Sequence, residues 1–239
     1  MMHAIIYYIG FFIALGGIGM AIANRKVDSE TARKRWLKYF TYILFTGIVI
    51  ASIFLHFFPW LSLLIVIITA VELVQVAHAA PDGSMGHTLV VLFLFAMAAS
   101  GFIFYAFHFT SAFLLFIYFQ VLVFDGFCQV CGQLIGRHAL VPRISPTKTV
   151  EGLAGGWLFC ILASLLAAAW VDFSLVKAGL YGLLTGGLSF CGDLLASWYK
   201  RKVKVKDYSN WLPGQGGFLD RFDSLIMTGC VYYLLYLFI

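Results

Sequence analysis

Acidic and basic side chains gather in one stretch of an otherwise apolar chain, SWYKRKVKVKDYSNWLPGQGGFLDRFD, residues 197–223. Asp220 and Asp223 are three residues apart, so a helical turn would place both carboxylates on one face. Carboxylates are ligands for Mg²⁺, and lysine and arginine side chains bind phosphate groups. Glycines let the backbone approach a ligand closely. This combination is typical of phosphoryl or nucleotidyl transfer, whereas a loop that only sets membrane topology needs neither aspartates nor glycines.

The preceding stretch, SFCGDLLASWYKR (residues 189–201), places Asp193 inside an apolar run. A charge at membrane depth costs about 2.5–3.5 kcal/mol on insertion scales and usually marks a functional site. Asp193 and Ser197 are four residues apart and would share a helix face. The alternative is an aspartate that is satisfied by hydrogen bonds inside the protein or near the interface.

A third polar stretch, SPTKTVEG (residues 145–152), lies directly before an apolar run. Hydroxyl groups at Ser145 and Thr149, the charge of Lys148 and a helix N-terminus would suit phosphate oxygens. The alternative is an ordinary helix cap, with Ser or Thr before the helix and Glu151 in its first turn. In both interpretations these residues precede the apolar run 153–171.

The elements that must position these residues are membrane helices. The chain has 239 residues, of which 62% are hydrophobic and 11% charged, whereas soluble domains carry about 25% charged residues. An α-helix of about 20 apolar residues spans a bilayer. Eight such runs predict an all-α polytopic membrane protein: 4–23, 39–58, 60–79, 88–107, 109–127, 153–171, 176–198 and 222–239. The first run is interpreted as a retained helix rather than a signal peptide.

Basic residues are distributed unevenly among the connecting loops. With eight spans, 15 of the 16 Lys and Arg residues fall on one side, and only Lys177 falls on the other. The positive-inside rule makes that side cytoplasmic and places the chemistry-bearing loops there. The loops on this side are 24–38, 80–87, 128–152 and 199–221.

Small residues recur at helical spacing elsewhere in the chain. Glycine pairs at 152/156 and 182/186 predict close helix packing, and such helices also permit a homodimer. Cys128 and Cys131 form a C-x-x-C pair without two further ligands at the spacing that zinc needs. The pair is therefore interpreted as small residues at a helix end.

The charged stretches together resemble the signature of the CDP-diacylglycerol synthases, also called phosphatidate cytidylyltransferases. The matching positions are Ser197, Lys200, Arg201, Lys206, Asp207, Leu212, Pro213, Gly214, Gly216, Gly217, Asp220, Arg221 and Asp223, with Gly192–Asp193, SPTKTVEG, Asp125, Gly132 and Gly136 upstream. Glu72 stands where members often have an acidic residue. The chain departs from the pattern at Gln215, where His is usual, at Tyr199, and at Cys128–Gln129.

The resemblance implies one integral membrane domain over 1–239, with an N-terminal helical part (1–59) and a cytidylyltransferase-like part (60–239). It implies CMP transfer from CTP to phosphatidate in the cytoplasmic membrane, with the active site facing the cytoplasm, contact with membrane lipids, and no role for nucleic acid. Mg²⁺, alone or with a second cation, would be held by Asp193, Asp220 and Asp223. Catalytic roles are implied for Asp193, Asp220, Lys206 and Arg221, and substrate binding for Ser145, Lys148, Thr149, Ser197, Lys200, Arg201, Asp207, Gln215, Gly216 and Gly217.

Two other functions are compatible with the same residues. The first is a related cytidylyltransferase that acts on another lipid phosphate, because the departures from the signature bear on the substrate more than on the chemistry. The second is a non-catalytic lipid-binding membrane protein of the same fold. Turnover of CTP separates the second from the first, and competition among lipid phosphates identifies the acceptor.

Overall fold

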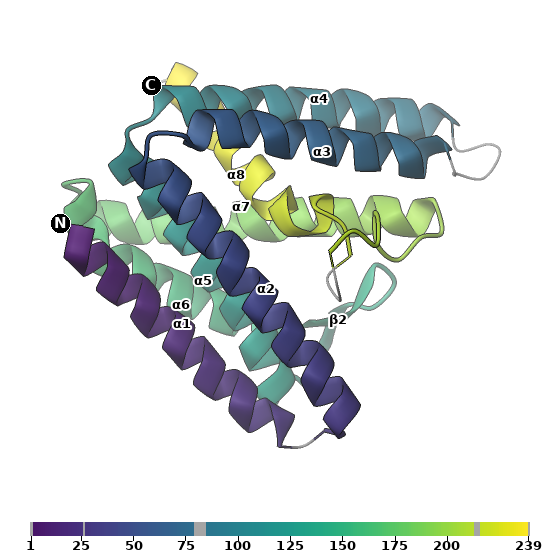
Figure 1. Ribbon diagram of the computed structural model, residues 1–239, viewed down its shortest axis with the longest axis horizontal. Helices are drawn as coiled ribbons and strands as arrows, with labels where there is room; N and C mark the ends of the chain where they lie inside the picture. Colours follow the sequence, from purple (N-terminus) through teal and green to yellow (C-terminus); the bar gives the residue numbers. More distant parts are fainter. Residues whose placement is uncertain (1, 26, 79–84, 213–215, 239) are drawn as a thin grey trace. The chain divides into compact units, whose positions relative to one another are not determined.

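The computed structural model describes residues 2–25, 27–78, 85–212 and 216–238, without the side chains of residues 2–6 and 85. The described chain is almost entirely helical, and its one sheet is a short antiparallel hairpin (Figure 1). The elements are α1 (Met2–Asn24), α2 (Ser29–Phe54), α3 (Phe58–His78), α4 (Met85–His108), α5 (Ser111–Ile135), β1 (Ala139–Val141), β2 (Ser145–Thr149), α6 (Val150–Leu166), the 3₁₀ helix η1 (Ala168–Trp170), α7 (Leu175–Lys202) and α8 (Leu219–Phe238). The predicted all-α class is confirmed.

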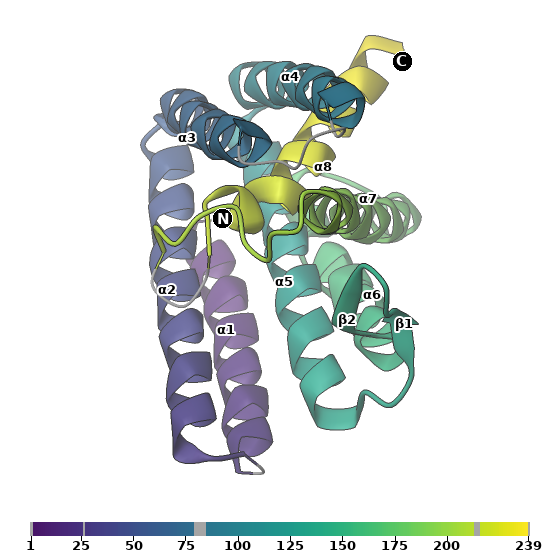
Figure 2. The same cartoon turned by 90° about the vertical axis from the view of Figure 1, so that its right-hand side faces the viewer.

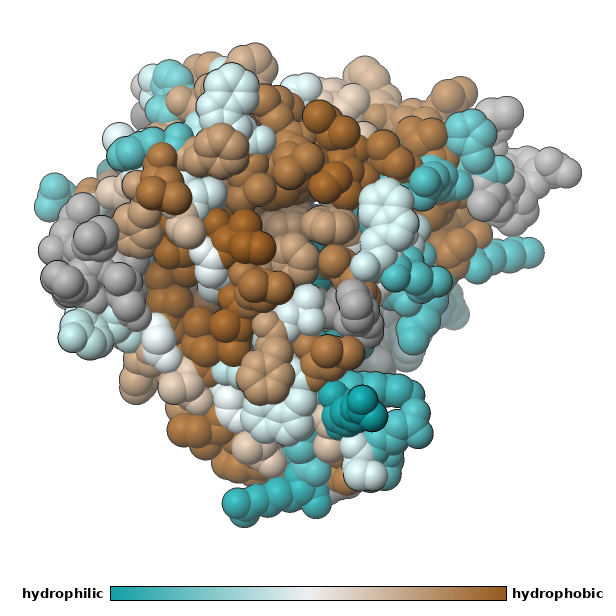
Figure 3. All heavy atoms as spheres, in the orientation of Figure 1, coloured by the Kyte–Doolittle hydropathy of each residue, from teal (hydrophilic) through white to brown (hydrophobic). Residues whose placement is uncertain are grey.

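Six of these helices, α1 to α5 and α7, are long and apolar enough to cross a membrane. Helix α6 is apolar but has 17 residues, and α8 does not belong to the six. Large hydrophobic side chains such as Phe40, Leu94 and Leu183 are more than half exposed. Figure 3 shows broad hydrophobic areas on one face. Since water would penalise such a surface, the protein is a multi-pass membrane protein.

Most predicted helix limits are close to the observed ones, but α5 continues eight residues beyond its predicted end at 127, into the predicted loop 128–152, and α2 differs at its start. This helix begins at Ser29, ten residues before the predicted apolar run, and so includes basic residues that were expected in a loop. Asp28 lies before the helix, and its Oδ2 accepts a hydrogen bond from Thr31 N at 2.9 Å. Glu30 and Lys34, four residues apart, form an ion pair of 2.5 Å on the first turns. Capping and charge pairing therefore extend the helix beyond its hydrophobic part.

The chain divides into two compact units, each built from two stretches of sequence. Unit 1 comprises Met1–Ile50 and Thr110–Gly187, and unit 2 comprises Ala51–Phe109 and Leu188–Ile239. Helix α7 contributes its first half to unit 1 and its second half to unit 2. The division at residue 59 or 60 that the family resemblance implies stays a prediction.

Unit 1 is organised around α5. Phe116 and Ile117, near the middle of this helix, are completely buried, as expected for a helix that is apolar on all sides. Phe12 of α1 packs edge-on against Phe119, with ring centroids 5.4 Å apart. The hydroxyl of Tyr42 on α2 donates to the carbonyl oxygen of Leu122 at 2.8 Å. Helix α5 thus forms the core on which the other elements of unit 1 pack.

Glycines bring α6 against α5, as the small-residue spacing predicts. A Cβ atom at Gly152 would lie 2.7 Å from the carbonyl oxygen of Cys128, and one at Gly156 would lie 3.1 Å from that of Phe124. Cys128 and Cys131 both lie on α5, and neither forms a disulfide. The Cys131 side chain occupies the space beside Gly155. The C-x-x-C pair therefore serves helix packing.

We expect Gly152→Ala to destabilise the protein by about 1–3 kcal/mol, because its methyl group would lie 2.7 Å from the backbone oxygen of Cys128 and 3.0 Å from the capping hydroxyl of Thr149. Gly126→Ala, on α5, is the matched control, since a Cβ atom there would have no neighbour within 4 Å among the described residues. Thermal unfolding in detergent should show a lower melting temperature for the first variant only. Equal melting temperatures for the two variants would contradict backbone contact at Gly152.

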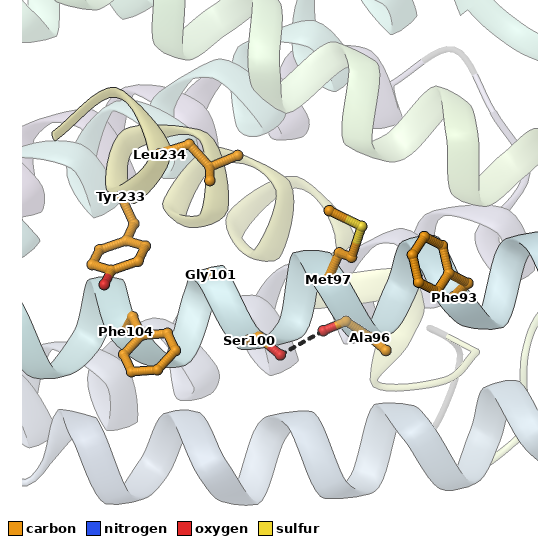
Figure 4. Close-up of a pocket in the computed structure, with 8 residues that line it drawn as sticks. All are labelled: Phe93, Ala96, Met97, Ser100, Gly101, Phe104, Tyr233 and Leu234. Carbon is orange, nitrogen blue, oxygen red and sulfur yellow. Dashed lines mark hydrogen bonds between the residues drawn. The ribbon is translucent and has the colours of Figure 1, made fainter. Parts of the chain in front are cut away.

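Unit 2 contains α3, α4, the second half of α7, and α8. Helices α3 and α4 run side by side, and α8 packs against both (Figures 1 and 2). Gly101 allows close approach of α4 to α8, because a Cβ atom there would lie 3.1 Å from Cys230 Cα. A groove of about 370 Å³ opens beside this contact (Figure 4), and it is lined by Phe93, Ala96, Met97, Ser100, Gly101, Phe104, Tyr233 and Leu234. The hydroxyl of Ser100 donates to Ala96 O of its own helix at 2.7 Å.

Candidate active site

The second half of α7 carries the first group of predicted site residues. Ser197 donates a hydrogen bond to Asp193 Oδ1 at 3.3 Å, which confirms that the two residues share a face. Ser189, one turn earlier, faces α8: its hydroxyl lies 3.4 Å from that of Thr228, and its carbonyl oxygen accepts from Ser224 Oγ at 3.1 Å. Gly192 lets the helices meet, because a Cβ atom there would lie 2.7 Å from the carbonyl oxygen of Asp223.

A buried ion pair joins α7 to the start of α8. The ammonium group of Lys200 contacts Asp220 Oδ1, and the two side chains are 10% and 3% exposed. Asp220 Oδ2 accepts hydrogen bonds from Tyr208 N at 2.9 Å and from Gly217 N at 2.8 Å. Asp220 therefore neutralises Lys200 and also organises the loop between α7 and α8. Removing one partner of such a buried pair leaves an uncompensated charge, which costs about 3–5 kcal/mol.

Tyr208 completes this cluster. Its hydroxyl donates to the carbonyl oxygen of Ala196 on α7 at 3.1 Å, and Lys200 Nζ lies 5.4 Å from its ring centroid. Burial raises the pKa of Tyr208 well above 10, and the negative charges of Asp223 and Asp220 raise it further. The phenol therefore stays neutral and keeps its donor proton, so the loop remains attached to α7.

Protein carboxylates occupy the space beside the two described glycines of the signature. Gly216 has φ of 83°, and a Cβ atom there would lie 2.8 Å from Asp220 Oδ2 and 3.0 Å from Asp207 Cβ. A Cβ atom at Gly217 would lie 2.7 Å from both carboxylate oxygens of Glu72. The glycines thus admit Asp220 and Glu72 to the backbone of the turn. Their predicted role in substrate binding stays a prediction.

Asp193 and Asp223 lie where α7 meets α8, because Gly192, next to Asp193, packs against the backbone of Asp223. No group of three or more His, Cys, Asp or Glu side chains among the described residues is arranged to hold a metal. Mg²⁺ is commonly held by one or two carboxylates together with substrate phosphates and water. The Asp193–Asp223 pair fits that donor set, and Asp220 is the next carboxylate on the same turn of α8.

Four further signature residues belong to the same unit as this cluster. The side chains of Arg201, Lys206 and Arg221 are exposed, and one guanidinium nitrogen of Arg201 donates to the carbonyl oxygen of Val205 at 3.1 Å. Asp207 is partly buried beside Gly216. Gln215 lies outside the described residues. The exposed basic groups are placed where a soluble anion can reach them.

Ser145, Lys148 and Thr149 belong to unit 1, where they form strand β2 of the hairpin (Figure 2). Thr149 is the N-cap of α6, and its hydroxyl oxygen accepts from Gly152 N at 3.1 Å. Glu151, in the first turn, accepts from Arg137 N at 3.0 Å and from His138 N at 3.2 Å, and it contacts His138 Nδ1 at 2.5 Å. The capping role is confirmed, and the phosphate-binding role stays a prediction.

The hydrogen bonds of Glu151 lead to a prediction about pH. The backbone N–H of Arg137, and then the side chain of His138, lower the pKa of Glu151 from 4.5 to about 2. For a lowered pKa, the stabilisation is complete above the unfolded-state value and is lost as the pH falls through the folded-state value. We expect the Arg137 and His138 amides to stay protected from exchange at pH 4 and to lose protection near pH 2. In Glu151→Gln this transition should be absent, and a wild-type midpoint at 4.5 would contradict the prediction.

Three residues that hold the loop before α8 were missed or given no specific role in the sequence analysis: Tyr208, Ser209 and the buried Glu72. Ser209 donates to Glu72 Oε1 at 2.6 Å, although the two residues are 137 positions apart. Tyr208 follows Lys206–Asp207 directly, and an aromatic residue within a charged loop was the available signal. For Glu72, the signal was a carboxylate in the middle of an apolar helix.

Comparison with known proteins identifies relatives of this chain. The model of the cytidylyltransferase family matches residues 1–239, including the N-terminal part that the resemblance did not cover. The chain is 46% identical over 103 residues to the uncharacterized protein YnbB of Escherichia coli (strain K12), covering 43% of the chain and 35% of that protein. It is 38% identical over 126 residues to a phosphatidate cytidylyltransferase of Aquifex aeolicus (strain VF5), covering 53% of the chain and 48% of the relative.

A phosphatidate cytidylyltransferase of Staphylococcus saprophyticus is 41% identical over 119 residues, which is 48% of the chain and 45% of the relative. These matches therefore span about half or less of each relative's length. The family model, in contrast, covers the described helices, the hairpin and the polar cluster without interruption. The chain belongs to the cytidylyltransferase family.

Proposed function

We propose that the protein transfers the CMP group of CTP to phosphatidate, which gives CDP-diacylglycerol and pyrophosphate. The observation that carries this proposal is the family match over the whole chain. The acidic and basic cluster of unit 2 supplies the groups that such a reaction requires, namely carboxylates for a metal and cations for phosphates. The membrane location suits an acceptor with acyl chains and a charged headgroup.

In the proposed reaction, an oxygen of the phosphatidate phosphate attacks the α-phosphorus of CTP. A new phosphorus–oxygen bond forms, the bond between the α-phosphorus and the bridging oxygen to the β-phosphate breaks, and pyrophosphate leaves with that oxygen. The attacking phosphate is already anionic at neutral pH, so the step needs no strong general base. A glutamine at position 215 is compatible with this chemistry, because glutamine does not titrate but can form hydrogen bonds.

The proposed metal ligands are Asp193, Asp220 and Asp223. Bound Mg²⁺ would supply positive charge that neutralises the triphosphate and the leaving pyrophosphate. Of these carboxylates, Asp193 and Asp223 belong to the contact between α7 and α8 that Gly192 permits, and two carboxylates are a common donor set for Mg²⁺. Asp220 holds Lys200 at the same end of α8. We also propose that the same carboxylates bind a second cation.

The proposed phosphate-binding groups are basic or hydroxylic. Lys206 and Arg221 are exposed, and we assign them to the phosphates of the two substrates, with Arg201 and Lys200 as further cations. Ser197 and Asp207 are proposed to support this group. Ser145, Lys148 and Thr149 of the hairpin are proposed to bind phosphate oxygens. The uneven distribution of Lys and Arg supports a cytoplasmic membrane protein with these groups on the cytoplasmic side.

The test uses purified protein in detergent–lipid micelles with labelled CTP, phosphatidate and Mg²⁺. The expected result is a CDP-lipid together with pyrophosphate, and both should disappear when EDTA is added. Lysophosphatidate and a polyprenyl phosphate serve as competing acceptors. Product from one of these acceptors but not from phosphatidate would identify a different lipid specificity. Folded protein that binds lipid but gives no product with any acceptor would overturn the enzymatic proposal in favour of a lipid-binding role.

A further inference from the structure

Glu72 is a buried carboxylate that no step of the proposed reaction uses. It lies on α3, and its side chain is completely inaccessible to solvent. Ser209 Oγ donates to Oε1 at 2.6 Å, Phe218 N to Oε1 at 2.9 Å, and Leu219 N to Oε2 at 2.8 Å. A buried carboxylate is costly unless it is hydrogen-bonded, and these three donors satisfy both of its oxygens.

All three donors belong to the loop that leads into α8 or to the first residue of that helix. Together with Gly217 N, which donates to Asp220 Oδ2 at 2.8 Å, three consecutive backbone N–H groups point to two carboxylates. The N-terminus of a helix attracts anions through its unpaired N–H groups and its dipole. Glu72 therefore provides the anion at this end of α8 from within the protein.

The contact requires a glycine at position 217. A Cβ atom there would lie 2.7 Å from each carboxylate oxygen of Glu72, so any side chain would push α3 and the turn apart. Thr69, one turn earlier on α3 and equally buried, instead donates to carbonyl oxygens of its own helix. Within this part of α3, the carboxylate at position 72 is the group that reaches the turn before α8.

We infer that Glu72 is a positioning residue that fixes the turn before α8 and thereby sets the direction of Asp220 and Asp223. The expected effect of Glu72 on turnover rests on the proposed function, whereas its role in holding the turn rests only on the observed hydrogen bonds. Because Glu72 satisfies the N–H groups of Phe218 and Leu219, those groups are not available to a substrate phosphate. The nucleotide and lipid phosphates must therefore be held by side chains and metal rather than by this helix N-terminus.

The experiment compares wild type, Glu72→Gln and the matched control Thr69→Val in lipid micelles. An amide side chain retains one acceptor oxygen but turns an NH₂ group either toward Leu219 N or toward Ser209 Oγ and Phe218 N, so in either orientation one backbone N–H faces another donor. We expect amide exchange of Phe218 or Leu219, whichever faces the NH₂ group, to accelerate by about tenfold in Glu72→Gln, and exchange of both to stay unchanged in Thr69→Val. We expect kcat for CTP to fall by about 10–100-fold, with a smaller change in KM.

The outcomes separate this inference from the proposed function. Unchanged exchange at Phe218 and Leu219 in Glu72→Gln would overturn the positioning role. Faster exchange with full turnover would overturn its catalytic consequence, and so would a loss of turnover that Thr69→Val shares. If wild-type protein turns over no CTP with any acceptor, the proposed function fails, while the exchange measurement still decides whether Glu72 holds the turn.

Discussion

Asp220→Ala is expected to abolish CTP turnover and to lower the free energy of unfolding by about 3–5 kcal/mol. The stability loss arises because Lys200 would remain buried without its partner, while two backbone N–H groups would lose their acceptor. The activity loss arises because the turn before α8 would lose one of its two carboxylate anchors. Turnover of CTP and thermal unfolding, both measured in the same micelles, test the two parts together.

A second substitution at Lys200 separates the structural part from the chemical part. In Lys200→Met with Asp220→Asn, no buried charge remains unpaired, so part of the lost stability should return. Turnover should not return, because the carboxylate is still missing. Restored turnover in the double variant would show that Asp220 acts only by neutralising Lys200, which would remove it from the proposed metal ligands.

Asp193→Asn is expected to lower turnover by at least about 100-fold, at the upper end of the losses known for groups around a metal, while stability stays the same or rises. Asparagine has the same shape and still accepts a hydrogen bond from Ser197. The substitution also removes one of the two carboxylates at the contact between α7 and α8, where an uncharged side chain costs less to bury. A stable and inactive variant is the signature of a group retained for function.

Ser197→Ala is the control for this prediction, because it removes the hydrogen bond to Asp193 but keeps both carboxylates. Its turnover should remain within about tenfold of wild type, which corresponds to the loss of one modest hydrogen bond. Full turnover by Asp193→Asn would eliminate Asp193 as a cation ligand. A large loss of stability in the same variant would instead indicate that the carboxylate is part of the core.

Most of the helical fold was predictable because hydrophobic runs of membrane-spanning length carry a strong signal. The shared face of Asp193 and Ser197, and the cap at Thr149, follow from spacing along a single helix. These features depend on residues that are three or four positions apart. Local geometry fixes such contacts before tertiary packing contributes.

The hairpin and the extended start of α2 were not predicted, for local reasons. Strand β2 has five residues and contains Pro146, so it lacks the alternating pattern that identifies longer strands. Helix α2 gains its first turns from a cap and an ion pair, which a search for apolar runs does not detect. Single caps and ion pairs contribute little free energy, so they affect where a helix begins or ends more than whether it forms.

The arrangement around the signature glycines depends on contacts between distant residues. Glu72 accepts from Leu219 N across 147 positions, and nothing near either residue indicates the other. From sequence alone, the glycines were expected to make room for a ligand. The space beside Gly217 is occupied by a carboxylate of α3, which only the tertiary structure reveals.

The distance in sequence between Glu72 and its donors also has a consequence for biosynthesis. At about 5–20 residues per second, a ribosome needs roughly 7–30 s to extend the chain from α3 to the residues that satisfy this carboxylate. Throughout that interval α3 carries an acidic group without its final partners, and water or the insertion machinery must solvate it. Assembly of unit 2 is therefore tied to the arrival of α8, and variants that delay α8 should leave α3 exposed to membrane quality control.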